Sequence, residues 1–196
     1  MRTVFYTAST LNGFLAGTGD DLQWLFDVPE EDGGPDPAAF IGSTAAGVCG
    51  AATYAWVLAH EAPPDVPGSW NDAMIGTSPL FLFTHRHPPI PEGADIRILS
   101  GPVSDHLATL AAEVGDGILW VIGGGDLAGQ FLDAGALDEI RVDIAPATVA
   151  AGKPLLPRDL GPDRLRLVSA QRSGQFAHLT YEVLPADGPE RPIGTD

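Results

Sequence analysis

A run of glycines between two regular segments is the part of the sequence whose residue types most clearly suggest chemistry. The run is Gly123, Gly124 and Gly125, followed by Asp126 and Leu127. It comes after an apolar stretch typical of a buried strand, and it opens a segment with helical spacing. A glycine backbone approaches a ligand closely, and the free N–H groups at a helix N-terminus bind negative charge. We therefore expect the pyrophosphate of an anionic cofactor at this turn.

Two other interpretations of the run compete with this one. The first is a tight strand-to-helix turn without a ligand. The second is the Gly-x-Gly-x-x-Ala pattern of a Rossmann fold, in which Asp143, about 20 residues farther on, binds the ribose. The run comes late in the chain, after several strands, and no further crossover helices follow it. Asp143 falls in mid-strand on a polar face, which also counts against the Rossmann fold.

A loop of unusual length follows the first predicted strand. Residues 10–22 contain several glycines together with Asp20 and Asp21, and long loops in compact domains are often functional. Asp21 is the best candidate for an acid near a substrate, although aspartates in such loops are more often solvated turn residues. Trp24 either covers a ligand pocket or stacks on a planar heterocycle, or it serves as a hydrophobic plug for the loop.

Histidines and isolated carboxylates elsewhere give weaker indications. His85, Arg86 and His87 lie together, but prolines follow them and no third ligand is near, so we predict a cofactor-phosphate contact and no metal site. Glu139 is expected to have a surface role. His178 has no partner that the sequence reveals.

Composition and charge exclude several classes of protein. The 196 residues contain Lys+Arg 10 against Asp+Glu 26, a formal net charge of −16. Nucleic acids and anionic membranes are therefore excluded as partners, because phosphate-binding surfaces need clustered Lys and Arg. No apolar run approaches the roughly 20 residues of a membrane helix, and the N-terminus has no signal-peptide pattern, so we expect a cytoplasmic protein. The single cysteine, Cys49, is expected to be a small buried residue.

Short apolar segments punctuated by glycine and proline predict an α/β fold. Strands are predicted at 3–9, 47–49, 80–84, 96–99, 118–122, 139–145, 164–170 and 176–184, and helices at 51–60, at 103–114 and around Leu127. We expect 80–84 and 96–99 to be central strands and the last two strands to form a hairpin. The predicted fold has three α/β/α layers, with a mainly parallel central sheet and an antiparallel C-terminal edge. It forms one domain over 1–186, followed by a flexible tail, 187–196.

Six motifs occur in an order that identifies a family. They are ASTLNGFLA at 8–16, DLQWL at 21–25, GAATY at 50–54, FLFTHR at 81–86, VIGGG at 121–125, and LDEI at 137–140 with Pro146. In this order they resemble the dihydrofolate-reductase-like family, most closely the reductase domain of the riboflavin-pathway deaminase-reductase. The resemblance extends over residues 3–184, most of the chain.

The resemblance implies an NADPH-dependent reductase. By the resemblance, Ala8 and Leu15 contact the nicotinamide, Gly50 and Thr53 lie by the pyrophosphate, Thr84 and Arg86 approach the adenosine ribose and its 2′-phosphate, and Gly123 to Leu127 hold the rest of the pyrophosphate. The resemblance, together with the apolar C-terminal strands, also favours a homodimer.

Two positions depart from the family pattern. Asn12 stands where the riboflavin-pathway enzymes usually have Asp, and an amide cannot act as a general acid. Ala51 stands where an Arg commonly grips the 2′-phosphate, which leaves Arg86 as the remaining fork-shaped donor. The candidate catalytic residues are Asn12, Asp21 and Trp24.

The expected activity is hydride transfer to an imine or carbonyl carbon of a small heterocyclic substrate. It resembles the reaction of 5-amino-6-(5-phosphoribosylamino)uracil reductase. A dihydropterin reductase and a non-catalytic nucleotide-binding or ligand-binding protein on the same fold are the alternatives.

Overall fold

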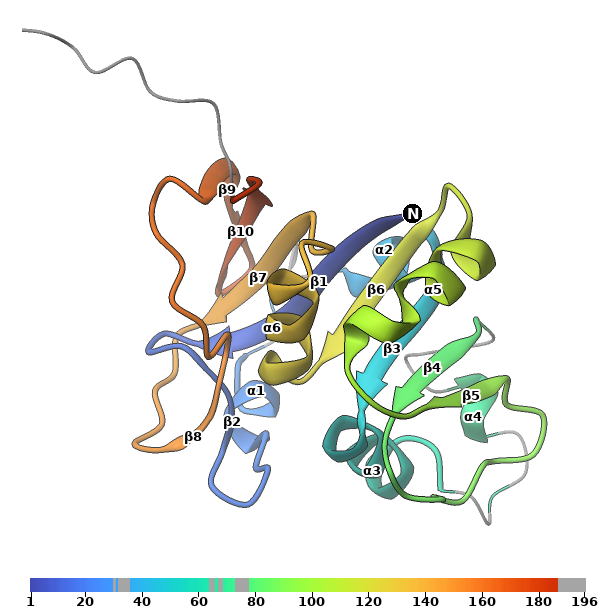
Figure 1. Cartoon of the computed structure of the whole chain (residues 1–196). Coiled ribbons are helices and arrows are strands. Elements are labelled where there is room, and N and C mark those ends of the chain that lie inside the picture. Colours follow the sequence, from blue (N-terminus) through green and yellow to red (C-terminus); the bar gives the residue numbers. More distant parts are fainter. Residues whose placement is uncertain (30, 32–35, 64–65, 67–68, 73–77, 187–196) are drawn as a thin grey trace, which may run out of the picture.

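Eight strands form the central sheet of the protein (Figure 1). A computed structural model describes residues 1–29, 31, 36–63, 66, 69–72 and 78–186. The strands are β1 (Arg2–Thr10), β3 (Thr44–Gly50), β4 (Leu80–Phe83), β5 (Ile96–Leu99), β6 (Ile118–Gly123), β7 (Glu139–Ala145), β9 (Leu165–Ser173) and β10 (Phe176–Val183). Their order is β5-β4-β3-β6-β1-β7-β10-β9, parallel from β5 to β7 and antiparallel at the last two strands. The predicted parallel sheet with an antiparallel C-terminal edge is confirmed.

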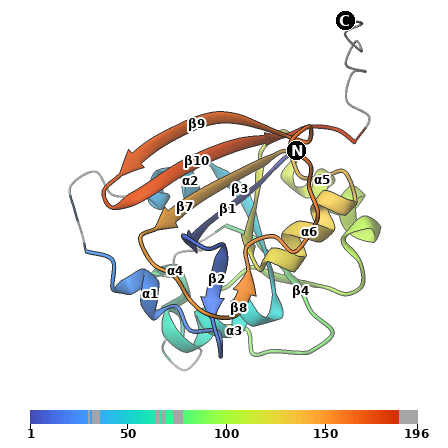
Figure 2. The ribbon, with the colours of Figure 1, turned by 90° about the vertical axis from the view of Figure 1, so that its left-hand side faces the viewer.

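Helices cover both faces of this sheet. They are α1 (Gln23–Phe26), α2 (Pro37–Ile41), α3 (Ala51–His60), α4 (Ser69–Asp72), the 3-10 helix η1 (Val103–His106), α5 (Leu107–Val114) and α6 (Gly125–Asp133). Figures 1 and 2 show α5 and α6 on one face and α2 on the other. The predicted helix at 51–60 is confirmed as α3. Gly50 is its N-cap, and prolines soon after His60 prevent its continuation.

The central strand β6 explains why its sequence is apolar throughout. Leu119 and Val121 belong to the hydrophobic cluster on the α5–α6 side, whereas Trp120 and Ile122 belong to the cluster on the α3 side. Successive side chains of a strand point to opposite faces, so a strand covered on both faces needs apolar residues at every position. β6 therefore ends between two packed layers, directly before the glycine run.

Two predictions about the arrangement of the strands are wrong. β5 is an edge strand, and its Ile98 is 37% exposed. The prediction failed because a short apolar run does not reveal whether strands will pair with both of its edges. Residues 10–22 are not loop throughout, because they contain β2 (Phe14–Gly17), which pairs with β8 (Gly152–Pro154) in a separate two-stranded sheet. This pairing was not visible locally, since the partner lies far along the chain.

Polar residues on β7 and β10 are also placed differently from the prediction. Glu139 is buried and forms ion pairs with Arg2 and Arg141, so its expected surface role is wrong. Asp143 is likewise buried, and His178 has a partner, since its Nδ1 lies 2.7 Å from Asp143 Oδ1. The polar face of β7 faces the protein interior, and its charges are satisfied by side chains from other strands.

No helix in the part of the chain that the structure describes is long and apolar enough to cross a membrane. The expected tail, 187–196, lies outside the described residues.

The reactivity of the Cys49 thiol reports on packing in the core on the α3 side of the sheet. The side chain is fully buried, and burial raises the pKa of its thiol from 9.0 to about 12. We expect a disulfide-exchange reagent at about pH 8 to leave the native thiol unmodified and to modify it rapidly in denaturant. Native modification at the denatured rate would contradict this packing.

The same shift predicts the direction of alkaline destabilisation. Above pH 9.0 the thiol ionises in the unfolded chain while it stays protonated in the folded one, so the free energy of unfolding falls as pH rises toward about 12. Denaturant titrations across this window should show a shallower decline in Cys49→Ala. An equal decline in both proteins would contradict the assignment.

Candidate active site

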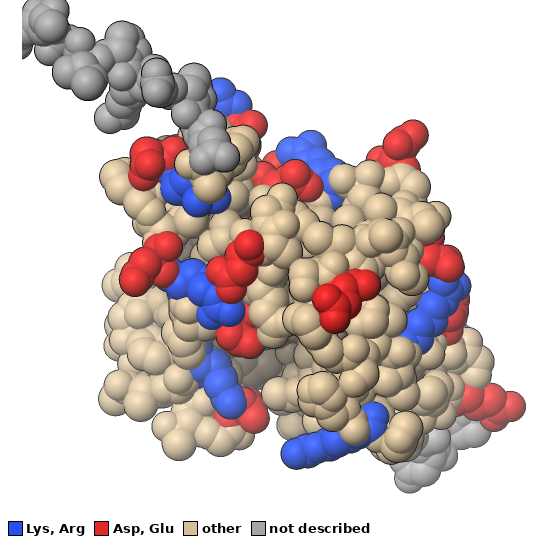
Figure 3. All heavy atoms as spheres, in the orientation of Figure 1, with Lys and Arg blue, Asp and Glu red and all other residues tan. Residues whose placement is uncertain are grey.

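Three neighbouring cavities form one groove near the carboxyl ends of β1, β4 and β6. Leu22 and Trp56 line all three cavities, which makes them parts of one continuous depression. Figure 3 shows the surface hollowed below α6, between the β2–β8 lobe and α3. We name the parts after their residues: a glycine cavity of about 470 Å³ in the middle, an arginine cavity of about 1050 Å³ on one side and a tryptophan cavity of about 380 Å³ on the other.

The glycine cavity is built where two helices begin. Gly50 is the N-cap of α3 and Gly124 is the N-cap of α6, and neither cap has a side-chain hydrogen bond to the first turn. Both glycines line the cavity. The N–H groups of the first helical turns have no partner within their own helix, so two helix N-termini offer donors to an anion at this place.

Close packing also requires the glycine run. A Cβ atom at Gly125 would clash with the backbone carbonyls of Pro154 and Leu155, and one at Gly123 would lie 3.1 Å from Thr53 Oγ1. The Gly123–Gly124 peptide is cis. The run is thus demanded by the contact with the β8 segment as well as by the open cavity before it.

Most of the predicted cofactor residues come together along the groove. Leu15, Gly50, Thr53, Gly123, Gly124, Gly125, Asp126 and Leu127 line the glycine cavity, Thr84 and Arg86 line the arginine cavity, and Ala8 lines the tryptophan cavity together with Leu15. Asp126 would repel an anion, but Arg158 lies 3.1 Å from it and offsets its charge. Lys153, the only lysine in the sequence, also lines the glycine cavity.

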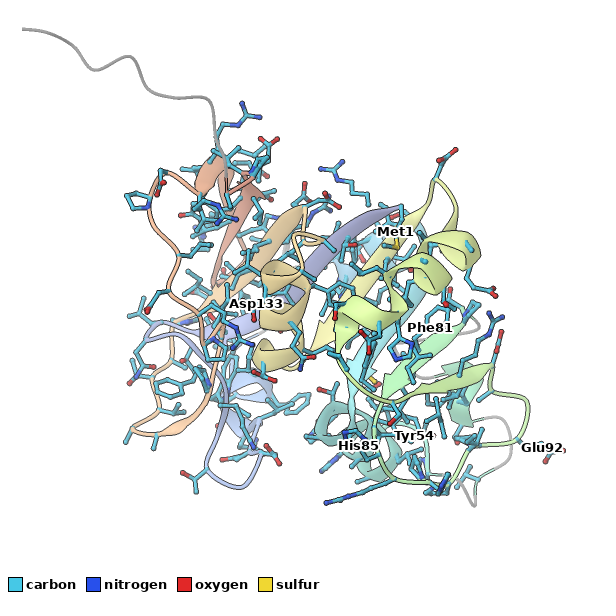
Figure 4. All side chains as sticks on the ribbon, in the orientation of Figure 1. Met1, Tyr54, Phe81, His85, Glu92 and Asp133 are labelled. Atoms are coloured by element: carbon cyan, nitrogen blue, oxygen red, sulfur yellow. The ribbon has the colours of Figure 1, made fainter. Side chains whose placement is uncertain are left out.

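Arg86 is the distinctive charge of the arginine cavity. Its backbone N–H donates to Thr84 Oγ1 at 3.0 Å, which shapes the turn after β4. Tyr54 Oη donates to Pro89 O at 2.7 Å and holds this segment against α3, in the region where Figure 4 labels Tyr54 and His85. His85 Nδ1 lies 2.9 Å from Ser100 Oγ. The turn that carries Arg86 is thereby fixed on both sides.

The guanidinium of Arg86 has no hydrogen bond or ion pair within the described residues. The other described arginines do: Arg2, Arg97, Arg141, Arg158, Arg166 and Arg172 pair with carboxylates, and Arg164 donates to a backbone carbonyl. Arg86 is therefore available to bind an anion in the groove.

The tryptophan cavity combines aromatic walls with one carboxyl. Trp24, Trp56, Trp120 and Phe176 supply aromatic wall, and Asp143 is the only carboxyl among the described residues that line the cavity. Asp143 accepts a hydrogen bond from Tyr6 Oη at 2.8 Å, and its other oxygen lies 2.7 Å from His178 Nδ1. Burial, followed by the hydrogen bond to Asp143, raises the pKa of Tyr6 well above its usual range, so the phenol stays protonated.

Sequence reasoning missed the trio of Tyr6, Asp143 and His178. The register places Ala8 opposite Asp143, and Asp143 opposite His178, so neighbouring strands bring these positions onto one face. The only local signal was the alternation of polar and apolar side chains along β7, where the polar positions lie on a face that turned out to be buried. Three strands from distant parts of the chain must be aligned before that signal becomes a site.

The structure separates the three predicted catalytic residues. Trp24 is buried, lines the tryptophan cavity, and has an indole N–H without a partner in the described chain. Asp21 lines the arginine cavity, where its carboxylate accepts a hydrogen bond from Gln23 N at 2.8 Å; it is not among the residues of the tryptophan cavity. Asn12 lines none of the three cavities.

Asn12 instead fixes the loop after β1. Its Nδ2 donates to Val149 O at 2.7 Å, and its Oδ1 accepts from Thr10 Oγ1 at 2.9 Å. The side chain is exposed, and both ends of its amide are used. The contact that the structure gives Asn12 is structural, and the carboxyl of the tryptophan cavity comes from β7.

Comparison with known proteins decides the family. The profile of the RibD C-terminal domain family matches residues 76–179, which is more than half of the chain. The chain belongs to this family. RibD C-terminal domains are reductase-like members of a riboflavin-biosynthesis group, in accordance with the resemblance of the six motifs.

Two relatives match this chain over nearly its whole length. The uncharacterized protein YwjB of Bacillus subtilis (strain 168) is 27% identical over 180 residues, which cover 92% of this chain and 97% of YwjB. A structure assigned to riboflavin biosynthesis from Shewanella sp. PV-4 superimposes with a TM-score of 0.74 at 22% identity, covering 94% of this chain and 99% of that one.

Two further structures relate the fold to named reductases. The diaminohydroxyphosphoribosylaminopyrimidine deaminase/5-amino-6-(5-phosphoribosylamino)uracil reductase of Thermotoga maritima has a TM-score of 0.62 at 17% identity, with 93% of this chain and 56% of that one covered. Dihydrofolate reductase of Enterococcus faecalis, complexed with NADP(H), has a TM-score of 0.57 at 15% identity, with 93% and 96% covered. This RibD C-terminal domain therefore has the dihydrofolate-reductase-like fold.

Proposed function

We propose that the protein is a cytoplasmic NADPH-dependent reductase that transfers a hydride to an imine or carbonyl carbon of a small heterocyclic substrate. One observation carries this proposal: a single groove holds an unpaired guanidinium, then two uncapped helix N-termini, then an aromatic cavity with a carboxyl. A dinucleotide phosphorylated on its ribose needs a cation for the ribose phosphate and helix N-termini for the pyrophosphate. The substrate needs the aromatic cavity beside them.

The residues of the groove fit the cofactor. Bound nicotinamide supplies the hydride, so the protein has to orient the ring, exclude water and provide a proton. Ala8 and Leu15 would hold the nicotinamide, since Leu15 lines both the glycine and the tryptophan cavities and Ala8 lines the tryptophan cavity beside it. The first turns of α3 and α6 would hold the pyrophosphate, and Arg86 the 2′-phosphate.

Local dipoles have to overcome the charge of the whole chain. A net charge of −16 repels an anionic cofactor, so attraction must come from nearby groups. Each helix N-terminus carries a partial charge of roughly +0.5, and Arg86 adds a full charge at the other end of the groove. Together these groups would offset the negative charges of a bound phosphorylated dinucleotide.

Relatives support the reaction type. The Thermotoga maritima relative is named as a 5-amino-6-(5-phosphoribosylamino)uracil reductase, and the Enterococcus faecalis relative was solved with NADP(H). Both share this fold. We propose a reduction of the same type, on a heterocycle bound in the tryptophan cavity.

Fluorescence titration with NADPH and NADH tests the cofactor. Trp56 lines the whole groove, so a bound dihydronicotinamide should quench its emission. We expect saturable binding of NADPH that is much tighter than that of NADH. Arg86→Ala should weaken NADPH binding by about 10- to 100-fold, the loss of hydrogen bonds to a charged group, and should leave NADH almost unchanged.

Arg97→Ala is the matched control for this experiment. Arg97 is a half-exposed arginine that pairs with Asp95 and Glu113 and lines none of the three cavities. Its removal should leave NADPH binding within about twofold. Failure of the unsubstituted protein to bind either nucleotide would refute the reductase proposal and favour a ligand-binding protein on the same fold.

We propose in addition that the protein is a homodimer that uses its C-terminal hairpin. β9 is an edge strand, and Leu167 and Val168 on it are 54% and 58% exposed. Apolar side chains on an exposed edge favour association with a second copy. Light scattering should give a dimer for the native chain and a monomer for Leu167→Glu combined with Val168→Glu, whereas a native monomer would refute the proposal.

A further inference from the structure

The tryptophan cavity has a chemistry of its own, distinct from that of the cofactor groove. Its aromatic walls favour a planar ring, since stacked or edge-on aromatic contacts stabilise such ligands. Asp143 is its only carboxyl, and the described lining contains no Lys, Arg or His. A planar heterocycle with N–H donors is the class of ligand that satisfies both features.

Asp143 lies where the reacting atoms of the proposed reaction would meet. In the register of β1 and β7, Asp143 pairs with Ala8, which also lines the tryptophan cavity. Leu15 and Ile122 line both this cavity and the glycine cavity. The carboxyl is thus near the boundary that a hydride would cross, and this inference rests on the proposed function.

One contact, between Asp143 and His178, leads from the tryptophan cavity to a second surface. His178 Nδ1 lies 2.7 Å from Asp143 Oδ1, and the His178 side chain is 25% exposed. His178 lines a separate cavity on the far side of this contact, together with Tyr6, Arg141 and Arg172. The imidazole therefore connects a carboxyl inside the substrate cavity with solvent outside it.

We propose that Asp143 is a catalytic residue that binds the N–H groups of the heterocycle as a carboxylate and passes on the proton for its reduction, with His178 as the positioning residue that delivers this proton. In reduction of a C=N bond, the π bond breaks, the carbon gains a hydride from the dihydronicotinamide, and the nitrogen gains a proton that the Asp143 carboxylate takes from the imidazolium of His178. The dihydronicotinamide is oxidised and the substrate is reduced by two electrons. Asp143 is then a carboxylate again, and solvent reprotonates His178.

Tyr6 has a supporting place in this scheme. Its hydroxyl donates to Asp143 Oδ2, and the protonated phenol keeps this direction because an ionised phenol is disfavoured by burial. A carboxyl oxygen has two lone pairs, so each oxygen of Asp143 can still meet a ligand N–H. Tyr6 and His178 together fix the plane of the carboxyl toward the cavity.

A second inference follows from the distribution of positive charge. The sequence has ten Lys and Arg residues, and of the nine that are described only Arg86 has a guanidinium or ammonium without a polar partner. Arg86 lines the arginine cavity and does not line the tryptophan cavity. Nothing in the described lining would offset a phosphate beside Asp143.

We infer that the substrate carries no phosphate group. In this respect it differs from the phosphoribosyl compound for which the Thermotoga maritima relative is named. A neutral or cationic heterocycle avoids repulsion by Asp143 and by the net charge of −16.

Binding of 2,4-diaminopyrimidine tests Asp143 without cofactor or turnover. This probe presents adjacent N–H donors to a carboxylate, and the three tryptophans of the cavity report its binding by fluorescence. Asp143→Asn keeps the shape of the side chain and removes the charge. We expect it to weaken the probe by about 10-fold or more while NADPH binding stays within about twofold.

Glu139→Gln is the matched control for Asp143→Asn. Glu139 is a buried carboxyl on the same strand and face, but it lines none of the three cavities. It should bind the probe within about twofold of the native protein. Thermal unfolding and the NADPH titration establish that each variant is folded, and equal probe affinity in native protein and Asp143→Asn would overturn the assignment. Failure of native NADPH binding would refute the proposed function alone.

Two substitutions at His178 separate its two roles. His178→Asn keeps a donor toward Asp143 but cannot carry a proton. We therefore expect it to bind 2,4-diaminopyrimidine with native affinity and, in the NADPH-dependent reduction, to keep the native KM while kcat falls by about 100-fold or more. His178→Phe should weaken the probe as well. An unchanged kcat in His178→Asn would overturn the delivery of the proton through this residue.

A matched pair of compounds tests the absence of phosphate. 5-Amino-6-(5-phosphoribosylamino)uracil and the same compound after phosphatase treatment differ only in that group. Competition against 2,4-diaminopyrimidine should show tighter binding of the dephosphorylated compound, by about 10-fold or more. Equal or tighter binding of the phosphorylated compound would overturn the inference.

Discussion

The parallel pairing of β3 with β6 is the constraint on which the groove depends. Parallel strands end at the same edge of a sheet, so the helices that follow β3 and β6 begin side by side. Gly50 and Gly124 are the N-caps of these helices, and both line one cavity. The two anion-binding ends are therefore a consequence of strand order, and the glycines let a ligand approach them.

Charge and burial divide the groove into regions with different tasks. The arginine and glycine cavities offer a guanidinium and helix N-termini, which suit phosphates. The tryptophan cavity offers aromatic rings and a carboxylate, which suit a ring with N–H donors. Because Leu22 and Trp56 line all three cavities, the two ligands would meet without an intervening layer of protein. A change in substrate can thus be made at the tryptophan cavity without altering the parts that suit phosphates.

The strands of the central sheet and the helices α3, α5 and α6 could be predicted from local sequence patterns, whereas β2, β8 and the short helices α1 and α2 could not. The glycine run, the start of α3 and Arg86 each lie within a short segment whose chemistry is visible by itself. Strand neighbours were harder, since β5 has the same kind of sequence as a central strand and β2 pairs with a segment far along the chain. The site at Asp143 was out of reach for the same reason. Its contacts join β1, β7 and β10: Tyr6 and Asp143 are 137 positions apart in the sequence, and Asp143 and His178 are 35 positions apart.

The proposed role of Asp143 does not depend on an acid at position 12. Asn12 uses its amide to hold the backbone of Val149, and its exposed side chain lies outside the groove. Asp143 supplies a carboxyl from a rigid strand, fixed by Tyr6 and His178 on either side. A group held by two hydrogen bonds within a sheet is better positioned for proton transfer than one on an exposed loop, because its rotamer and plane are set before a ligand binds. Although Asn12 lies outside the groove, the tryptophan cavity therefore has a carboxyl that is already in place.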